Sequence, residues 1–437
     1  MSGSGLGVAA GGASRRRSSS VTNALEQVPL NSQATSSHSH GHAHHAGHKI
    51  QGQAGSANQG KSEIKPLSGR SRPRPSDDLV LGDMYYTKGF LKDLISFRWM
   101  TIPSSSLKLM MIMPVLYLNH LALVHLGILS PETPNPFAAC LFLSGKTANG
   151  KYTKAWGDWA FVLWHTVWWS LVRQSMTLYV LRPLAYWFKI KRSKIMRFTE
   201  QGYALFYFGI LSGCGIYVMH GLSTWWYRTE HFWLEYPHRE MTLELKLYYL
   251  MQAAYWLQQS MIMVLKVEKP RKDYYELIAH HIVTLWLIGW SYIENLTYIG
   301  VSIFVTMDVS DTFIGFSKCV NYIDESKSVP PFLVFLVVWT YMRHYLNIKI
   351  LYSVYSEWHL IPEANRQVFD PWRDKWMPPW MQWQIFIPIA LLQVINLLWY
   401  YLLMRILFRA LVFNDRRDER SDDEEEEKPV LKDGKAE

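Results

Sequence analysis

Two histidines and two aspartates interrupt a long apolar stretch of this sequence. His280 and His281 are adjacent, and Asp308 and Asp311 follow in ELIAHHIVTLWLIGWSYIENLTYIGVSIFVTMDVSDTFIGFSK, which is long enough to cross a bilayer twice. Ionisable groups at membrane depth are costly, rarely face lipid and mark functional sites. An imidazole can act as a general base or a nucleophile, and a carboxylate bonded to one ring nitrogen raises the basicity of the other. These four residues therefore form a candidate acid/base site inside a membrane.

The spacing within each pair limits where the side chains can point. Adjacent histidines on a helix diverge by about 100°, so only one of them can aim directly into a central cavity. Asp308 and Asp311 stand at i and i+3 and can face the same direction. Two alternatives stay open: such polar groups can simply bond helices together, or they can bind a metal. A membrane di-iron site needs several histidine clusters, whereas the spans offer one His-His pair and isolated histidines such as His165, His220 and His344, so we predict no metal.

The composition divides the chain into two polar ends and an aromatic, apolar middle. The mean hydropathy of −0.06 averages these regions, because 49% of the 437 residues are apolar. Residues 1–77 contain almost no aliphatic run and the tail from Asn414 is nearly all charge, so both are predicted to be disordered. Cys140, Cys214 and Cys319 lack metal or redox spacing, and we expect no disulfide framework.

Eight apolar segments are long enough to cross a bilayer, since a span needs about 20 mostly apolar residues. They are residues 107–129, 159–181, 201–222, 245–265, 275–293, 297–317, 330–352 and 384–408. Several carry polar residues, namely His165, Arg173, His220, Gln258, Gln259, Arg343 and Asn347. These interruptions predict an all-helical bundle with a polar interior. The first apolar span begins beyond residue 100, so no secretory signal is expected and internal spans must direct insertion.

The basic residues predict that both termini are cytosolic. RPLAYWFKIKRSKIMRF lies between spans two and three, KVEKPRKDYYE lies between spans four and five, and four arginines follow span eight. The formal charge of +9 is explained by these span ends and does not indicate nucleic acid. In this orientation the histidines lie about 8–10 Å inside span five, and Asp311 lies about 10 Å from the cytosolic end of span six. The two pairs are therefore predicted to reach a similar depth.

Basic residues also mark the cytosolic entrance to the histidine span. The topology rule explains Lys266, Lys269, Arg271 and Lys272, but the same charges can attract an anionic substrate that bears phosphate. We take Lys269, Arg271 and Lys272 as candidate substrate-binding residues.

Four short motifs lie outside this site. The sequon at Asn295 falls in a very short turn, where we expect no glycosylation. HSHGHAHHAGH is interpreted as a solvated tract. RRRSSS, and Ser421 before DDEEEE, resemble kinase sites and predict a phosphoprotein.

The histidine and aspartate spans resemble a known family. RKDYYELIAHHIVTLWLIGWSYIENLTYIGVSIFVTMDVSDTFIGFSK is similar to the longevity-assurance signature of ceramide synthases, in the TLC-domain superfamily. The likeness includes the His-His pair, the hydrophobic spacing and the M-D-x-S-D element. The eight-span layout, the acidic tail and the lack of a homeobox-like insertion resemble fungal members.

The resemblance implies a fold and an activity. It implies a six-helix TLC barrel formed by spans two to seven, in the endoplasmic reticulum membrane. The implied domains are a disordered arm (1–80), a first span with its lumenal loop (81–154), the TLC domain (155–360), a lumenal loop with the last span (361–413), and an acidic tail (414–437). The implied reaction transfers an acyl group from acyl-CoA, as co-substrate, to the amine of dihydrosphingosine or phytosphingosine.

The resemblance also implies residue roles and partners. His280 would be the nucleophile with His281 as its partner, or an imidazole would act as base. Asp308 and Asp311 would orient the imidazoles and hold the substrate. Fungal relatives work with a small single-pass regulatory subunit, and dimers with the same or a paralogous catalytic subunit are implied. Two rival functions are a lipid-binding TLC protein, many of which lack the His-His pair, and a membrane acyltransferase with another acceptor.

Overall fold

The fold was analysed in a computed structural model that describes residues 87–266 and 273–412. The predicted sites at Lys269, Arg271 and Lys272, the HSHGHAHHAGH tract, RRRSSS and Ser421 lie outside these residues. The long helices are α4 (Pro103–His125), α6 (Gly157–Ser175), α8 (Arg192–His220), α9 (Leu243–Val264), α10 (Tyr274–Ile293), α11 (Thr297–Ile323), α12 (Val329–Trp339), α13 (Asn347–Ser356) and α15 (Met381–Val412). The described part of the chain contains helices and isolated β-bridges but no strand, which confirms the all-helical prediction.

Each predicted span coincides with a helical pass. The passes are α4, α6 continued by α7 (Arg182–Trp187), α8, α9, α10, α11, α12 continued by α13, and α15. Four of the described helices are both long and apolar enough to cross a membrane: Pro103–His125, Arg192–His220, Thr297–Ile323 and Met381–Arg409. The protein is therefore a multi-pass membrane protein, and the number of eight spans stays a prediction.

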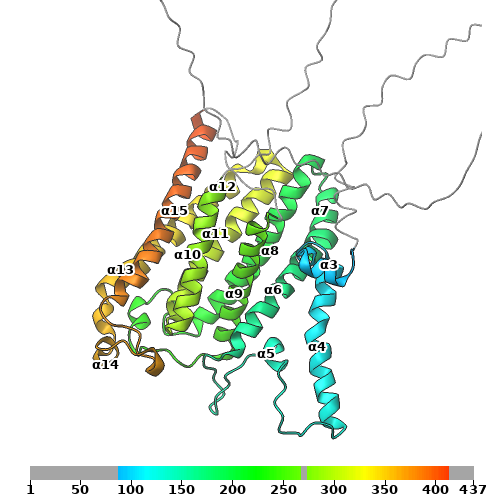
Figure 1. Cartoon of the computed structure of the whole chain (residues 1–437). Coiled ribbons are helices and arrows are strands. Elements are labelled where there is room, and N and C mark those ends of the chain that lie inside the picture. The colour runs from blue at the N-terminus through cyan, green and yellow to red at the C-terminus, as the bar shows by residue number, and fades with distance from the viewer. Residues whose placement is uncertain (1–86, 267–272, 413–437) are drawn as a thin grey trace, which may run out of the picture. The chain divides into compact units, whose positions relative to one another are not determined.

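Six passes close into a ring. Going round it, α8 packs against α11, α11 against α12, α13 against α15, α15 against α10, α10 against α9, and α9 against α8 (Figure 1). Helix α6 packs on the outside of α9, and α4 packs on α6. The resemblance implies a barrel formed by spans two to seven within residues 155–360, and these bounds stay a prediction. By its helix contacts, the ring consists of the passes from α8 to α15.

Two passes are interrupted by π-helical turns. Met176–Leu181 (η2) joins α6 to α7, and Pro183, which has no N–H to donate, lies in the first turn of α7. Thr340–Leu346 (η5) joins α12 to α13 and carries Arg343 and His344. A π-turn inserts an extra residue into the helical ladder and is found preferentially at functional sites. Arg343 is buried within this turn and pairs with Asp311 of α11.

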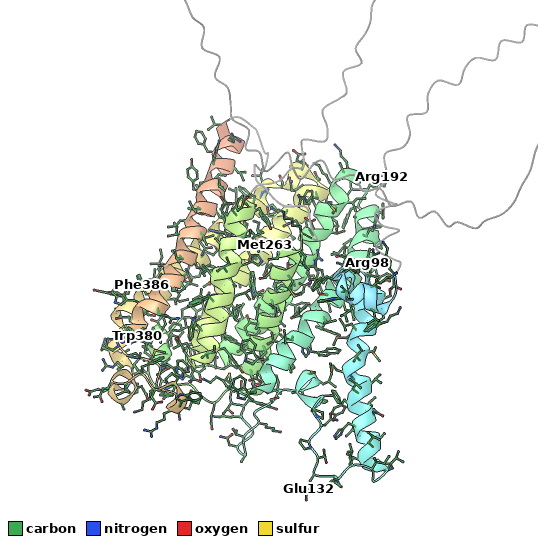
Figure 2. The ribbon with its side chains drawn as sticks, in the orientation of Figure 1. Arg98, Glu132, Arg192, Met263, Trp380 and Phe386 are labelled. Atoms are coloured by element: carbon green, nitrogen blue, oxygen red, sulfur yellow. The ribbon has the colours of Figure 1, made fainter. Side chains whose placement is uncertain are left out.

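The two ends of the bundle are named here by the residues that mark them. Figure 2 shows Arg192 at the end where Met263 lies, and Glu132 and Trp380 toward the opposite end. We call the first the mouth end and the second, which contains the α10–α11 turn, the turn end. Only three residues, Glu294 to Leu296, make that turn, and Asn295 adopts a positive φ of 60°, which asparagine tolerates well. Asn295 is 2% exposed, which supports the prediction that its sequon is unmodified.

Candidate active site

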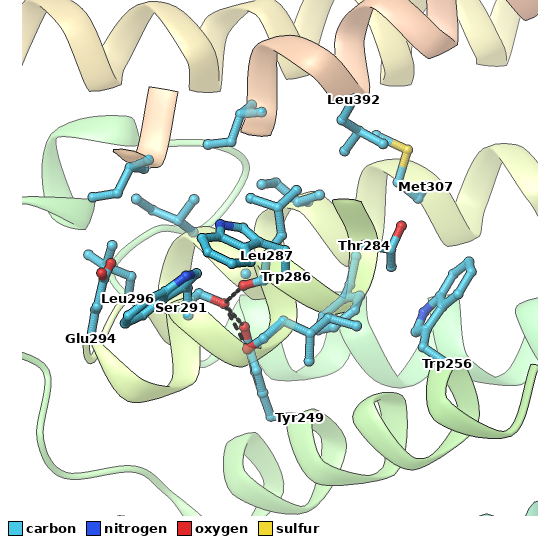
Figure 3. A pocket seen from close by; sticks show the side chains of 18 of the residues that line it. Tyr249, Trp256, Thr284, Trp286, Leu287, Ser291, Glu294, Leu296, Met307 and Leu392 are labelled. Carbon is cyan, nitrogen blue, oxygen red and sulfur yellow. Dashed lines mark hydrogen bonds between the residues drawn. The ribbon is translucent and has the colours of Figure 1, made fainter. Parts of the chain in front are cut away.

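A cavity inside the ring extends from His280 to the turn end, where Glu294 lies. Its walls come from α9, α10, α11 and α15, and it holds about 690 Å³ of space not occupied by atoms, part of it open to the surroundings. The walls are mainly aliphatic and aromatic: Ile288, Ile299, Ile303, Phe304, Met307, Ile385, Ile389 and Leu392. Figure 3 shows Trp256, Thr284 and Met307 toward one end and Glu294 and Leu296 toward the other.

His280 lines the cavity, whereas His281 is not among the lining residues. This fits the divergence of about 100° between adjacent helical side chains. The His280 ring lies between two tryptophans, with its centroid 5.6 Å from that of Trp256 and 5.2 Å from that of Trp399. Its Nδ1 is buried without a protein partner, and its Nε2 is 3.5 Å from the Thr284 hydroxyl. Most of the hydrogen-bonding capacity of His280 is therefore available to a ligand in the cavity.

His281 is held in one tautomer. Its Nδ1 lies 2.8 Å from the backbone carbonyl of Leu277, one turn earlier on α10. A carbonyl oxygen only accepts hydrogen bonds, so Nδ1 carries the proton and Nε2 keeps its lone pair. The two imidazole rings are 5.7 Å apart and nearly perpendicular. The histidine pair thus offers one ring facing the cavity and a second ring of defined protonation beside it.

Asp308 belongs to a buried polar network on the other side of α11. Its Oδ2 accepts a hydrogen bond from the Gln252 amide at 2.5 Å and a long one from the Tyr248 hydroxyl at 3.4 Å. The Tyr207 hydroxyl donates to the Gln252 carbonyl oxygen at 2.7 Å. These contacts join α8, α9 and α11. Within the described residues, no hydrogen bond links Asp308 to either imidazole.

Asp311 is paired with a buried arginine. Nη2 of Arg343 is 2.6 Å from Asp311 Oδ1 and 3.3 Å from the Met307 carbonyl oxygen. Nε donates to Ser310 at 2.6 Å and Nη1 to Asn396 at 3.1 Å. The guanidinium also lies 4.0 Å from the centroid of the Trp339 ring, within cation–π range. Arg343 therefore ties α11, η5 and α15 together around Asp311.

The sequence predicted that the two aspartates can face one direction and orient the imidazoles. In the structure Asp308 turns to α9 and Asp311 to η5. The network also contains Gln252 and Tyr207, which the sequence analysis did not single out. A polar amide inside the apolar run LYYLMQAAYWL was the available signal for Gln252. Arg343 was recognised as a polar interior residue, but its pairing with Asp311 was not predicted.

A second polar group closes the turn end of the cavity. The side chain of Glu294 is fully buried and lines the cavity. Oriented with its nitrogen toward Glu294, the Gln384 amide donates to Glu294 Oε1 at 3.2 Å and accepts from the Trp290 indole at 3.1 Å. Burial raises the pKa of Glu294 to about 8, and nearby Lys154 opposes this shift. The carboxyl is therefore mostly protonated at neutral pH.

The sequence matches the TLC domain family model over residues 197–405. That stretch begins within α8 and ends within α15, as does the ring, and differs from the predicted residues 155–360. Sphingosine N-acyltransferase lac1 of Schizosaccharomyces pombe is 40% identical over 283 residues, which cover 64% of this chain and 73% of the relative.

Two further relatives have names of the same kind. Ceramide synthase LAG1 of Saccharomyces cerevisiae is 37% identical over 63% of this chain and 67% of its own length. Sphingosine N-acyltransferase-like protein FUM17 of Gibberella moniliformis is 36% identical over 74% of this chain and 82% of its own. The family resemblance of the histidine and aspartate spans is thereby confirmed. The chain belongs to the sphingosine N-acyltransferase, or ceramide synthase, family of TLC-domain proteins.

Proposed function

We propose that this protein is an acyl-CoA-dependent sphingosine N-acyltransferase that forms ceramide inside the ring. One observation carries the proposal: the buried imidazole of His280, with unused hydrogen-bonding capacity, lines a cavity whose walls are mainly apolar. Relatives named as sphingosine N-acyltransferases support the reaction class. The acyl chain lies along the aliphatic walls toward the turn end, with its thioester near His280.

The reaction needs one proton removed from the amine and one returned to the leaving thiolate. In the covalent route, the unprotonated nitrogen of the neutral His280 ring attacks the thioester carbonyl and the C–S bond breaks. The CoA thiolate takes the proton from the other ring nitrogen and leaves, and the sphingoid amine then attacks the acyl-imidazole. The amide bond forms, the C–N bond to the ring breaks, and the proton of the amine passes to the ring, which regenerates His280. In the alternative route, His280 takes the proton of the amine while the amine attacks the thioester directly, and then gives it to the leaving thiolate.

His281 and the aspartates have supporting roles in this proposal. The fixed tautomer of His281 leaves its Nε2 lone pair able to accept the proton of the amine. Asp308 and Asp311 act through the helices that they hold, because their described partners are Gln252, Tyr248 and Arg343. Orientation of the imidazoles by either carboxylate remains a proposal that substrate-bound geometry must test.

The remaining proposals concern location and partners. We propose the endoplasmic reticulum membrane, with both termini cytosolic, so that CoA meets the basic segment containing Lys269, Arg271 and Lys272. The acceptor is dihydrosphingosine or phytosphingosine. A small single-pass regulatory subunit, and a dimer with the same or a paralogous catalytic subunit, complete the proposed assembly.

The test is N-acylation of a sphingoid base by the purified protein with acyl-CoA, with the regulatory subunit supplied. His280→Ala and His281→Ala are compared with His359→Ala, which changes an exposed histidine. We expect ceramide from wild type and His359→Ala, and a large loss of product from His280→Ala. Mass spectrometry after incubation with acyl-CoA alone distinguishes the two routes, because only the covalent route gives acylated His280. If wild type forms no ceramide, the proposal is overturned in favour of a lipid-binding TLC protein or another acceptor.

A further inference from the structure

We propose that Glu294 and Gln384 form a polar floor that limits the length of the acyl chain, which makes them specificity-determining residues. The inference rests on the proposed function, because it assigns an acyl chain to the cavity. It adds a boundary to that site at the end remote from His280. Both residues line the same cavity as His280, so a chain attached near the imidazole extends toward them.

The lining changes character abruptly at this end. Between the two ends the walls come from isoleucine, leucine, phenylalanine and methionine side chains on α10, α11 and α15. At the turn end Ser291, Glu294 and Gln384 add polar groups to a lining that also contains Trp290 and Leu296. The hydroxyl of Ser291 is hydrogen-bonded to that of Tyr249, also a lining residue, as Figure 3 shows. A methylene chain meets favourable surface until it reaches this polar group.

The floor is held from outside the cavity. The backbone carbonyl of Glu294 accepts a hydrogen bond of 2.7 Å from the buried Tyr236 hydroxyl. The carbonyl of the preceding residue, Ile293, accepts one from Lys154 Nζ at 2.5 Å. Lys154 and Arg239 both pair with Asp374, each at 3.3 Å, which anchors the segment before α15 against the α10–α11 turn. Moving the floor would therefore disturb the three segments that contain Lys154, Tyr236 and Asp374.

Passing the floor is unfavourable for an apolar chain. A longer chain must separate Gln384 from Glu294 and Trp290 and leave buried polar groups without partners. Unsatisfied buried groups are costly, whereas each additional methylene gains little in return. Glu294 follows His280 by 14 positions along α10 and its C-cap, a rise of about 21 Å. We expect the floor to discriminate by roughly tenfold between chains that end before it and chains that must displace it.

The test is a competition assay on the full chain in proteoliposomes with its regulatory subunit. An equimolar series of saturated acyl-CoAs, from 14 to 26 carbons, competes for one sphingoid base, and mass spectrometry gives the product lengths. Glu294→Ala and Gln384→Ala open the floor and should raise the ratio of the longest to the shortest products roughly tenfold. Ile299→Phe narrows the cavity just before the floor and should shift the products toward shorter chains. Glu294→Gln keeps the size and polarity of the side chain and should shift the ratio less than Glu294→Ala.

Glu363→Ala, at an exposed glutamate in α14 (Glu363–Arg366), is the matched control and should keep the wild-type distribution. Chromatographic profiles and melting temperatures show which variants are folded. The inference is overturned if folded Glu294→Ala and Gln384→Ala give the wild-type distribution, or if both lose every chain length equally. Failure of the proposed function looks different, because wild type would then form no ceramide at any length.

Discussion

The surroundings of His280 and of Arg343 show how one bundle uses polar side chains in two ways. Arg343 directs its guanidinium hydrogen bonds to Asp311, Ser310, Asn396 and the Met307 carbonyl. The His280 ring has one long hydrogen-bond contact, from Nε2 to the Thr284 hydroxyl. Its Nδ1 has no hydrogen-bond partner among the described residues. A saturated buried cation holds helices together, whereas a buried imidazole with free bonding capacity is costly unless a ligand uses it. In the proposed function, this difference separates a residue that stabilises the ring from a residue that reacts.

Arg343→Met is the strongest test of the stabilising role in this contrast. The substitution leaves Asp311 without its arginine and removes the hydrogen bonds to Ser310 and Asn396. Breaking a buried ion pair from one side costs about 3–5 kcal/mol, so the melting temperature in detergent should fall substantially. Arg228→Met removes an exposed arginine and should change little. Equal melting temperatures for the two variants would contradict the role of Arg343.

Gln252→Leu should have the next largest effect. It removes the amide between Tyr207 and Asp308 and leaves both with unmet hydrogen bonds. A buried group without a partner costs about 1–3 kcal/mol, which should appear in the unfolding free energy. Gln367→Leu, at an exposed glutamine, is the control and should stay within about 0.5 kcal/mol of wild type. A Gln252→Leu protein as stable as this control would show that the network is dispensable.

Glu294, at the turn end, predicts a pH dependence of stability. The pKa of Glu294 is raised by burial to about 8, against about 4.3 in an unfolded chain. The folded state therefore keeps a proton that the unfolded state loses, so stability falls as pH rises between these values and levels off above them. The slope is about 1.4 kcal/mol per pH unit for this group. Thermal unfolding of Glu294→Gln across pH 5–9 should lack this contribution, and an unchanged slope would exclude a protonated Glu294.

Thr284→Val tests the one weak contact of His280 and should have the smallest effect. The hydroxyl is 3.5 Å from His280 Nε2, which is too long for a strong hydrogen bond. We expect turnover within a few-fold of wild type and an unchanged melting temperature. A loss as large as that of His280→Ala would mean that Thr284 is required to position the imidazole.

The helices were predictable from the sequence because each is an apolar run of bilayer length. The ring could not be predicted in the same way, because apolar runs do not show which helices pack side by side. Helix contacts put α15 in the ring, whereas the resemblance implied a barrel of spans two to seven. The π-turn at Thr340–Leu346 also escaped prediction, since one extra residue barely changes the apolar pattern. The His-His pair and both aspartates could be found from their cost in a membrane. Their partners could not, because Gln252 and Arg343 reach Asp308 and Asp311 from distant segments.

The proposed function requires that His280 takes part in the acyl transfer and does not merely support the fold. Turnover per folded molecule and melting temperature, measured together for His280→Ala and wild type, test it most directly. We predict a loss of ceramide formation of at least about 100-fold, as for removal of a general base or nucleophile, with little change in melting temperature. Turnover within a few-fold of wild type would contradict the claim and make the histidine structural.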